Sequence, residues 1–463
     1  MISLDTVLAA TGGRASPACP RAFRGVSTDS RTVRAGDLFF AVRAQRDGHD
    51  FVAAALGAGA GAAVVEDSSG LFEMRRTDAL ISVPSTVAAL GDLARLWRKS
   101  IAGMKVVCIT GSTGKTTTRR ALEAVVASSG REFVAGKKSF NNHLGLPLTL
   151  LEAGGGCGVC LAEAGVNSPG EMARLAEIAS PDMGAVTNIG TAHIGNFGSR
   201  EKIAGEKARL FEGFGKESRF AVNLDDPLAE GIAAGLSCRK TSFSMRSRSA
   251  DVSASGVTHS TGRMDFSLLL GGRAFPVSVR AAGEHNVMNL LCAAALGMCL
   301  DIPPGVIAEG VRRFEPAGMR MEVLGGRGGL TLINDCYNAS PDSVSAALRE
   351  LCRLKQAAPA GTGAVAVLGD MLELGDRSAE YHREAGREAA RLGVDFLVGF
   401  GGMADEVRAG APDVSSHSAV SHGDAADIIA SVAKPGDIVL IKGSRAMEME
   451  RITSLLRPQG GGS

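Results

Sequence analysis

The sequence predicts an α/β protein of three domains, and three observations support this fold class. The chain has 463 residues, more than one hydrophobic core normally organises. Short apolar runs alternate with stretches of helical periodicity, which is typical of parallel sheets flanked by helices. After the first alternating series of strands and helices, a second and a third such series follow along the chain. We therefore expect a small N-terminal α/β domain at 1–100, a central parallel-sheet domain built around a phosphate loop at 101–316, and a Rossmann-like α/β domain at 317–463.

Three short strands and one long helix are expected in the first domain. Residues 37–42, 62–66 and 79–83 are apolar runs of strand length. Ser85 can cap the helix that follows, which ends near Ser100. Its apolar residues recur at helical spacing, at Val87, Leu90, Leu93, Leu96 and Trp97.

The second and third domains each contain a series of buried-strand patterns. These lie at 106–109, 159–162, 183–186 and 219–222, and then at 330–333, 364–368, 396–398 and 438–441. Polar or Gly residues follow the runs, for example Asn334 and Lys442. Open α/β sheets bind ligands outside the carboxyl ends of their strands, so we expect a site among these following residues.

Composition gives no sign of a nucleic-acid or membrane partner. Apolar residues make up 45% of the chain, charged residues 21%, and the formal net charge is +1. Such a chain has no general attraction for nucleic acid or anionic lipid. Asp5 lies where a secretory signal is basic, and no apolar run approaches the ~20 residues of a membrane span. We expect a cytoplasmic protein, without membrane insertion, that acts as a monomer.

The nine cysteines are predicted to be buried, reduced thiols. Cys157 and Cys160 form a CxxC pair, but no second Cys pair or His cluster accompanies them. Val159 and Leu161 make this segment typical of a buried strand. A structural role is therefore favoured over a redox or zinc site.

The segment VVCITGSTGKTTT predicts a binding loop for a nucleoside triphosphate. A buried strand leads into a Gly-rich and hydroxyl-rich loop and then into a helix that continues to Ala127. Glycines let backbone N–H groups approach phosphate oxygens, Lys115 can reach the terminal phosphates, and the Thr116 hydroxyl can bind magnesium. Ile109 replaces the first Gly of the eight-residue P-loop pattern, so the loop is a shorter form. Its residues are Gly111, Ser112, Thr113, Gly114, Lys115, Thr116 and Thr117.

A compact loop of this form resembles that of the Mur ligase family, which includes folylpolyglutamate synthase and cyanophycin synthetase. Other segments resemble the family over nearly the whole chain: KSFNNHLGLPLTLL from Lys138, AEAGVNSPGE, TNIGTAHIGNFGS, EKARLF and GEHNVMNLLCAAAL. The resemblance implies an ATP-dependent ligase that activates a carboxylate as an acyl phosphate and joins it to an amine. It implies ATP as the nucleotide and Mg2+ as the metal.

By resemblance, Glu163, His193 and Lys207 bind magnesium, the last as a carbamate. Oxygen-rich ligands suit Mg2+, and two ions can neutralise the γ-phosphate and orient the attacking carboxylate. Taken singly, Glu163 could be a helix-capping acid and His193 an ordinary loop histidine. Their placement after successive strands of the P-loop sheet favours the metal site.

Two further segments are expected to contact ATP. By resemblance, Asn289 contacts adenine, and His285 and Asn286 lie near the nucleotide. The same helix is also expected to face the core, through Leu290, Leu291, Ala294 and Ala295.

Arg320 resembles the arginine that reaches ATP from the start of the third domain, although Met319 stands where the family usually has Gly. Asp335 and Tyr337 are expected beside the same nucleotide. Asp335 or its neighbours are also candidates to orient or deprotonate the incoming amine, with no base singled out.

The third domain is expected to bind the incoming amine. Its segments resemble the family member that takes D-alanyl-D-alanine: INDCYNASPDSVSAAL, VLGDMLELGDRSAEYH and KGSRAMEME. Asn338 and Ala339 are the predicted contacts, whereas the Asp-Asn-Pro-Arg stretch of the diaminopimelate-adding ligase is absent.

The first domain resembles the family's uridine-diphosphate-binding domain. The predicted contacts are Ser27, Thr28, Asp29, Ser30 and Arg31, whose hydroxyls, Asx-type turn and guanidinium suit uracil and diphosphate. The same stretch could equally be a solvated turn. Asn141 and Asn142 are expected near the peptide part of the substrate.

The resemblance thus implies UDP-N-acetylmuramoyl-tripeptide and D-alanyl-D-alanine as substrates, in peptidoglycan synthesis. Lys115, His193 and Asp335 are the candidate catalytic residues. Closure of the third domain over ATP is expected, because water would hydrolyse an acyl phosphate. Two alternatives stay open: folylpolyglutamate synthase, and a P-loop switch protein that makes no amide bond.

Overall fold

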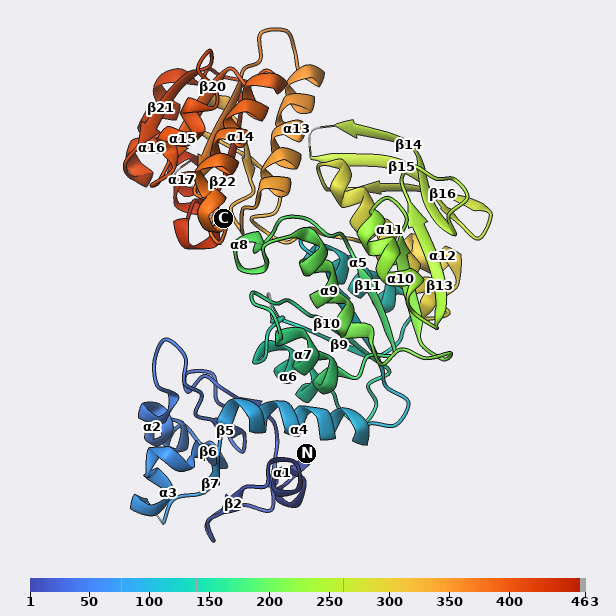
Figure 1. Ribbon diagram of the computed structural model, residues 1–463, viewed down its shortest axis with the longest axis vertical. Coiled ribbons are helices and arrows are strands. Elements are labelled where there is room, and N and C mark those ends of the chain that lie inside the picture. Colours follow the sequence, from blue (N-terminus) through green and yellow to red (C-terminus); the bar gives the residue numbers. More distant parts are fainter. Residues whose placement is uncertain (76, 138–139, 261, 459–463) are drawn as a thin grey trace.

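The computed structural model describes residues 1–75, 77–137, 140–260 and 262–458, and these form three α/β domains (Figure 1). The blue N-terminal domain lies at one end of the molecule, with the green and yellow central domain beside it and the orange and red C-terminal domain at the other end. The predicted fold class is confirmed. In the ranges just given, no helix has both the length and the apolar character needed to cross a membrane.

The N-terminal domain is built on a five-stranded sheet in the order β2-β7-β6-β5-β4. The strands from β4 to β7 are parallel, so the segments that follow them meet at one edge. The strands are β2 (Arg14–Ala15), β4 (Val26–Ser27), β5 (Leu38–Phe40), β6 (Ala62–Glu66) and β7 (Leu80–Val83), with a separate pair β1 (Ile2–Ser3) and β3 (Ala22–Phe23). The helices are α1 (Leu4–Thr11), α2 (Val52–Gly57) and α3 (Leu71–Met74).

Helix α4 (Thr86–Ser100) joins the first two domains and begins, as predicted, at a Ser85 cap. It lies between them in Figure 1, against α6 (Gly145–Leu151) and α7 (Glu171–Ala179) of the central domain. Trp97 Nε1 donates to the Ala153 carbonyl at 2.9 Å. Arg98 pairs with Asp182 at 2.7 Å. The helix therefore holds the N-terminal domain on the central one.

The central domain has a nine-stranded sheet in the order β16-β15-β14-β13-β12-β11-β8-β10-β9. Strand β8 lies where the order reverses, between β10 and β11, and ligands bind at such switch points in open α/β sheets. The strands are β8 (Lys105–Thr110), β9 (Phe133–Ala135), β10 (Val159–Glu163), β11 (Met183–Val186), β12 (Arg219–Asn223), β13 (Arg239–Ser244), β14 (Val252–Ser260), β15 (Arg263–Leu270) and β16 (Arg273–Val279). All are parallel except the antiparallel β14-β15-β16 extension.

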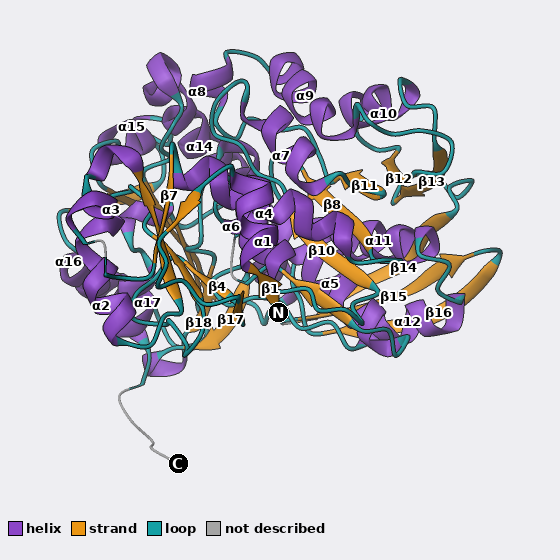
Figure 2. Ribbon diagram, turned by 90° about the horizontal axis from the view of Figure 1, so that it is seen from below, coloured by secondary structure: helices purple, strands orange, loops and turns teal. Residues whose placement is uncertain are grey.

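Helices cover both faces of this sheet (Figure 2). Val106 and Cys108 of β8 join one apolar cluster, and Val107 and Ile109 join another, as alternation along a strand requires. The first face packs on α7, α9 (Arg200–Ala208) and α10 (Pro227–Ala234). The second packs on α5 (Lys115–Ser128), α11 (Glu284–Cys299) and α12 (Pro304–Arg312).

The C-terminal domain has a six-stranded sheet in the order β17-β18-β22-β19-β20-β21, parallel except for β17. The strands are β17 (Glu322–Gly325), β18 (Thr331–Asn334), β19 (Ala364–Gly369), β20 (Phe396–Phe400), β21 (Ser415–Ala419) and β22 (Ile438–Lys442). Its helices are α13 (Pro341–Ala357), α14 (Ser378–Leu392), α15 (Ala404–Ala409), α16 (His422–Val432) and α17 (Glu450–Leu456).

The predicted strands at 62–66 and 183–186 match β6 and β11 residue for residue, and the others differ by one or two residues at an end. The short strands β1 to β4, and strands β9, β13 to β17 and β21, were not among those predicted. The nine cysteines are free thiols, but Cys19 and Cys238 are only half-buried, which corrects the expectation that all are buried. Both lie at positions only partly covered by the core.

Burial raises the pKa of the Cys157 and Cys160 thiols, and the described residues contain no cluster of three or more His, Cys, Asp and Glu side chains able to hold a metal ion. The two thiols are therefore poor nucleophiles, as their predicted structural role requires.

Candidate active site

The phosphate loop lies between β8 and α5, at the switch point of the central sheet. Gly111 has φ 148° and Gly114 has φ 81°, in the region that favours glycine. A Cβ at Gly111 would collide with the Thr187 hydroxyl, and one at Gly114 would collide with the Asn289 side chain. These two glycines are therefore required by conformation and by space.

Lys115 begins α5 and folds back over the loop, where its Nζ donates to the Gly111 carbonyl at 2.7 Å. Burial lowers the pKa of Lys115 to about 8, although the nearby Glu163 carboxylate favours the charged form. An anionic phosphate beside Nζ would therefore be paired with a cation that the loop has already desolvated.

Glu163 ends β10 and is only 1% exposed. The Thr116 hydroxyl donates to its Oε2 at 3.0 Å, and Arg119 Nε donates to its Oε1 at 2.7 Å. Arg320 of the C-terminal domain donates in turn to the Thr116 hydroxyl oxygen at 3.2 Å. The structure thus brings three sequence-predicted residues together around one carboxylate.

Arg119 was missed by sequence reasoning, although a signal was available. It lies four positions after Lys115 on α5, so both residues point from the same face of the helix. The guanidinium neutralises Glu163 and also pairs with Glu123.

Arg320 stacks on Tyr337, with its guanidinium carbon 3.9 Å from the ring centroid. It is flanked by Met319 at φ 59° and Met321 at φ 51°, two non-glycine residues in the left-handed region. Met319, at the position where the family pattern has Gly, thus adopts a backbone conformation that favours glycine.

His193 precedes the short helix α8 (Ile194–Phe197), and its Nδ1 bonds Glu373 of the C-terminal domain. Lys207 lies on α9 and is 3% exposed. Burial, with the charge of Lys115, holds the pKa of Lys207 well below its usual range. Burial also lowers the pKa of His193, whereas the Glu373 carboxylate raises it.

Asp335 follows β18 and is tied on both oxygens. Lys442 Nζ donates to its Oδ2 at 2.6 Å, and the Met321 amide donates to its Oδ1 at 3.1 Å. The same Nζ donates to the Asn338 carbonyl at 2.9 Å, and the adjacent Ala339 is buried. Both expected amine-side residues therefore lie next to a fixed ammonium group.

On α11, the Asn289 amide oxygen accepts from the Thr118 hydroxyl at 3.4 Å and lies against Gly114 of the phosphate loop. Asn286 donates to the Ala282 carbonyl at 2.7 Å. Burial lowers the pKa of His285. The predicted core-facing residues of this helix are buried, namely Leu290, Leu291, Ala294 and Ala295.

Asn142 accepts from the Leu144 and Gly145 amides at 3.1 and 3.0 Å and so orders the start of α6. The Asn141 carbonyl accepts from the Gly165 amide at 2.8 Å, just after β10. These two asparagines therefore lie on the P-loop edge of the sheet, while Lys138 falls outside the described residues.

In the N-terminal domain, Ser27 ends β4, and the turn after it contains an ion pair between Arg31 and Asp29 at 2.7 Å. The hydrogen bonds from Arg31 lower the pKa of Asp29 to about 2. The Asx-type turn forms as predicted, since the Arg31 amide donates to the Asp29 carboxylate at 3.0 Å. Thr28 and Ser30 belong to the same turn.

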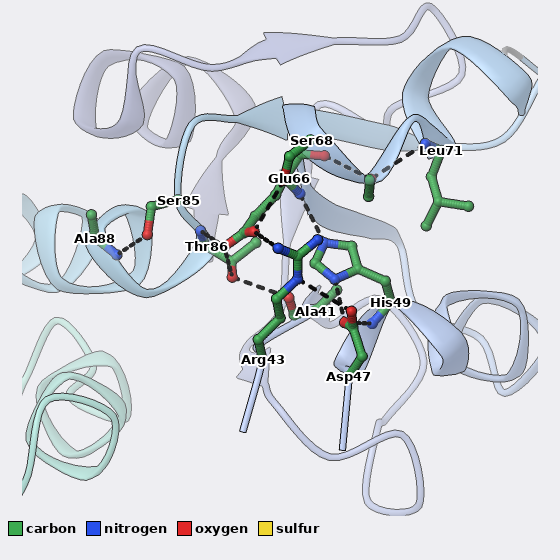
Figure 3. A network of polar contacts seen from close by, with 11 residues as sticks. Ala41, Arg43, Asp47, His49, Glu66, Ser68, Leu71, Ser85, Thr86 and Ala88 are labelled. Atoms are coloured by element: carbon green, nitrogen blue, oxygen red, sulfur yellow. Dashed lines mark hydrogen bonds and ion pairs between the residues drawn. The ribbon is translucent and has the colours of Figure 1, made fainter. Parts of the chain in front are cut away.

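A polar network that was not predicted lies at the same sheet edge (Figure 3). The His49 amide and ring both bond Asp47, and His49 Nε2 accepts from the Glu66 amide at 2.9 Å. Arg43 bridges the Asp47 and Glu66 carboxylates, both at 3.2 Å. The network fixes the loop after β5 to the end of β6. These residues come directly after strands, and this placement in the sequence could have indicated a site here.

The fold and the site define a three-domain P-loop enzyme that uses ATP. Family models match the chain at residues 22–98 (Mur ligase family, catalytic domain), 109–297 (Mur ligase middle domain) and 319–445 (Mur ligase, glutamate ligase domain). The chain belongs to the Mur ligase family of ATP-dependent ligases.

Several known proteins are similar over nearly their whole length. UDP-N-acetylmuramoyl-tripeptide--D-alanyl-D-alanine ligase of Bacillus subtilis is 34% identical over 92% of each chain. The crystal structure of MurF from Acinetobacter baumannii gives a TM-score of 0.87 at 29% identity, with 98% of each chain covered. MurF ligase from Thermotoga maritima in complex with ADP gives 0.80 at 28% identity, covering 93% of this chain and 96% of that one.

Proposed function

We propose that the protein joins D-alanyl-D-alanine to UDP-N-acetylmuramoyl-tripeptide, with cleavage of ATP to ADP and phosphate, as a cytoplasmic monomer in peptidoglycan precursor synthesis. The observation that carries this proposal is the similarity to the Bacillus subtilis enzyme of that activity over 92% of both chains. It is supported by a site in which Thr116 of the phosphate loop and His193 both meet side chains of the third domain.

Each domain is assigned one ligand in this proposal. Residues 1–100 bind the nucleotide-sugar, 101–316 bind ATP, and 317–463 bind the incoming dipeptide. The first assignment uses the turn from Ser27 to Arg31, whose hydroxyls and guanidinium lie at the carboxyl edge of a parallel sheet. The last uses Asn338 and Ala339 beside Lys442.

The residues around Glu163 fit magnesium. A buried carboxylate and a hydroxyl 3.0 Å apart are hard oxygen donors, and Arg119 pairs with that carboxylate at 2.7 Å. Thr116, Glu163, His193 and a carbamylated Lys207 would hold two ions. Burial lowers the pKa of Lys207 and so favours the neutral amine, which is the form that reacts with carbon dioxide. When bound, Mg2+ supplies charge neutralisation for the transferring phosphoryl group.

In the first step, the terminal carboxylate of the tripeptide attacks the γ-phosphorus of ATP, and ADP leaves. Lys115 and Arg320 hold the phosphates, so the step is mainly one of positioning and charge stabilisation. Asn289, which lies against Gly114 of the loop, is assigned to adenine in this proposal.

In the second step, the neutral amine of D-alanyl-D-alanine attacks the acyl carbon. The tetrahedral intermediate collapses, the C–O bond to phosphate breaks, and the departing phosphate takes the proton that the amine loses. Lys115 stabilises the charge that develops, and His193 would contribute through the metal ion that it helps to hold. Asp335 is assigned the role of fixing Lys442, with which it forms an ion pair at 2.6 Å.

The test is phosphate release from ATP and magnesium, with the two substrates added separately and together and with product mass measured. Release and a mass gain equal to the dipeptide only when both are present are expected. If free amino acids replace the dipeptide, another member of the family is indicated. ATP turnover without either substrate would favour the switch protein, and product from folate substrates would favour folylpolyglutamate synthase.

A further inference from the structure

A carboxylate from the C-terminal domain bonds the imidazole of His193 in the central domain. Glu373 lies in the turn after β19, and its Oε2 accepts from His193 Nδ1. An ionised carboxylate can only accept, so the ring proton is on Nδ1. Nε2 is then the ring nitrogen whose lone pair can bind a metal ion.

The backbone of the same turn is fitted to α8. The Gly195 amide donates to the Glu373 carbonyl at 3.1 Å. A Cβ at Gly195 would collide with the Gly375 nitrogen and lie 2.7 Å from the Leu374 carbonyl carbon. Glu373 itself has φ 63°, a conformation that non-glycine residues rarely adopt. The turn can therefore reach His193 only because residue 195 has no side chain.

The ion pair adds little to stability by itself, because the Glu373 side chain is 44% exposed. Its expected effect is on the imidazole, namely on which nitrogen carries the proton and on how the ring is oriented. A histidine that binds a metal usually donates its other N–H to a carboxylate or carbonyl, which fixes the tautomer and the ring orientation.

We propose that Glu373 is a positioning residue that the third domain delivers to His193, and that it orients Nε2 toward the metal site when the two domains meet. This inference rests on the proposed function, because it takes His193 as a ligand of that site. Metal binding and domain contact are then linked, and each strengthens the other by the same factor.

The test uses the full-length protein with a non-hydrolysable ATP analogue, titrated with Mn2+ and followed by electron paramagnetic resonance. Glu373→Ala should raise the dissociation constant of the Mn2+ bound at His193 about 10- to 100-fold. The spin-echo modulation from the imidazole nitrogen should disappear at Mn2+ concentrations that saturate the unchanged protein. Glu384→Ala is the matched control, an exposed carboxylate on α14 of the same domain.

Gly195→Ala provides a second variant that leaves both side chains in place. Its methyl group should keep the turn away from His193 and weaken Mn2+ binding to a similar extent. Gly231→Ala on α10 is its control, because a Cβ there meets no atom within 4 Å. Adding Glu373→Ala to Gly195→Ala should have no further effect, since both remove one contact.

The inference would be overturned if Glu373→Ala left the Mn2+ affinity unchanged. It would also be overturned if Glu373→Ala weakened Mn2+ binding as much in the His193→Ala variant as in the protein that retains His193. Thermal unfolding shows whether each variant is folded, and Glu373→Ala is sufficient if Gly195→Ala is not. Product formation is measured separately. Normal Mn2+ coupling without ligated product would refute the proposed function alone, and product with no Mn2+ effect would refute the inference alone.

Discussion

Glu163 shows how single residues set the chemistry of the site. The Glu163 carboxylate is only 1% exposed and loses most of its hydration on folding, so it needs a compensating charge nearby. Arg119, itself 5% exposed, supplies the compensating charge from the phosphate-loop helix. Removing one partner of such a buried pair leaves the other without compensation.

Arg119→Met should therefore lower the free energy of unfolding by about 3–5 kcal/mol, measured by urea unfolding with EDTA present. Arg120→Met at the neighbouring, less buried position should change it by less than about 1 kcal/mol. Adding Glu163→Gln to Arg119→Met should restore part of the loss, and additive losses in the double variant would contradict the pairing.

His382 is a second residue whose protonation is fixed by its surroundings. It is 1% exposed, its Nε2 accepts from the Met371 amide at 2.8 Å, and its Nδ1 donates to the Ser378 carbonyl at 2.7 Å. Burial lowers the pKa of His382, against the Ser378 carbonyl and the Asp370 and Glu406 charges, which raise it. The neutral ring holds the turn that leads to Glu373.

Because the pKa of His382 is lower in the folded state, its stabilisation is complete above pH ~6.5 and is lost as the pH falls toward the folded-state pKa. His382→Gln should be less stable at pH 8, and its deficit should shrink below pH ~6.5 by at most about 1.4 kcal/mol per pH unit. Urea midpoints from pH 5 to 8 give this difference. His417→Gln, at an exposed position of β21, is the control substitution and should change the free energy of unfolding at pH 8 by less than about 0.5 kcal/mol.

At the scale of elements, the segment between the central and C-terminal domains is strained. Met319 and Met321 both have positive φ, and they place Arg320 between Thr116 and Tyr337. A non-glycine residue in this region costs about 1–2 kcal/mol. The strain is therefore located at the point where the third domain is connected.

Met319→Gly should be about 1–2 kcal/mol more stable than Met319→Ala, because both lose the side chain and only Gly relieves the backbone. At Met288, within α11, Met288→Ala should instead be more stable than Met288→Gly, since Gly in a helix costs about 1 kcal/mol relative to Ala. Thermal unfolding of the four variants measures both differences. Equal stability of the two Met319 variants would show that the conformation is not strained.

At the scale of the whole molecule, the central and C-terminal domains meet beside the phosphate loop. The Thr191 amide and hydroxyl donate to Asp342 at 2.5 and 2.6 Å, and a Cβ at Gly190 would collide with that carboxylate. The Gly190 amide, directly before Thr191 in that central loop, donates to the Ser112 hydroxyl oxygen at 2.9 Å. Hydrogen bonds therefore connect Asp342 of the C-terminal domain, through residues 190 and 191, to the loop that would hold ATP.

We expect the molecule to become more compact when both ATP analogue and nucleotide-sugar substrate are bound, measured by small-angle scattering. Asp342→Ala should reduce this change, because it removes the acceptor of two hydrogen bonds across the domains. Asp376→Ala, also in the C-terminal domain, should retain it. Equal compactness with and without the ligands would contradict closure.

The sequence by itself determined the features that depend on neighbouring residues. The phosphate loop, the Ser85 cap and most parallel strands were predicted because each follows from a local run of residue types. Strands β14 to β16 were missed although they also have a local signal, since buried and exposed residues alternate along β15. One side of such a strand is polar, so it has no continuous apolar run like that of a buried parallel strand.

Only the tertiary structure decided which charged groups meet. His193 and Glu373 are 180 residues apart, and Thr191 and Asp342 are 151 apart. No periodicity relates such positions, because their contact depends on how two separately folded domains are packed and on a glycine small enough to let their backbones approach. Sequence therefore specified the phosphate chemistry, and domain packing supplied the partners of the residues that carry it.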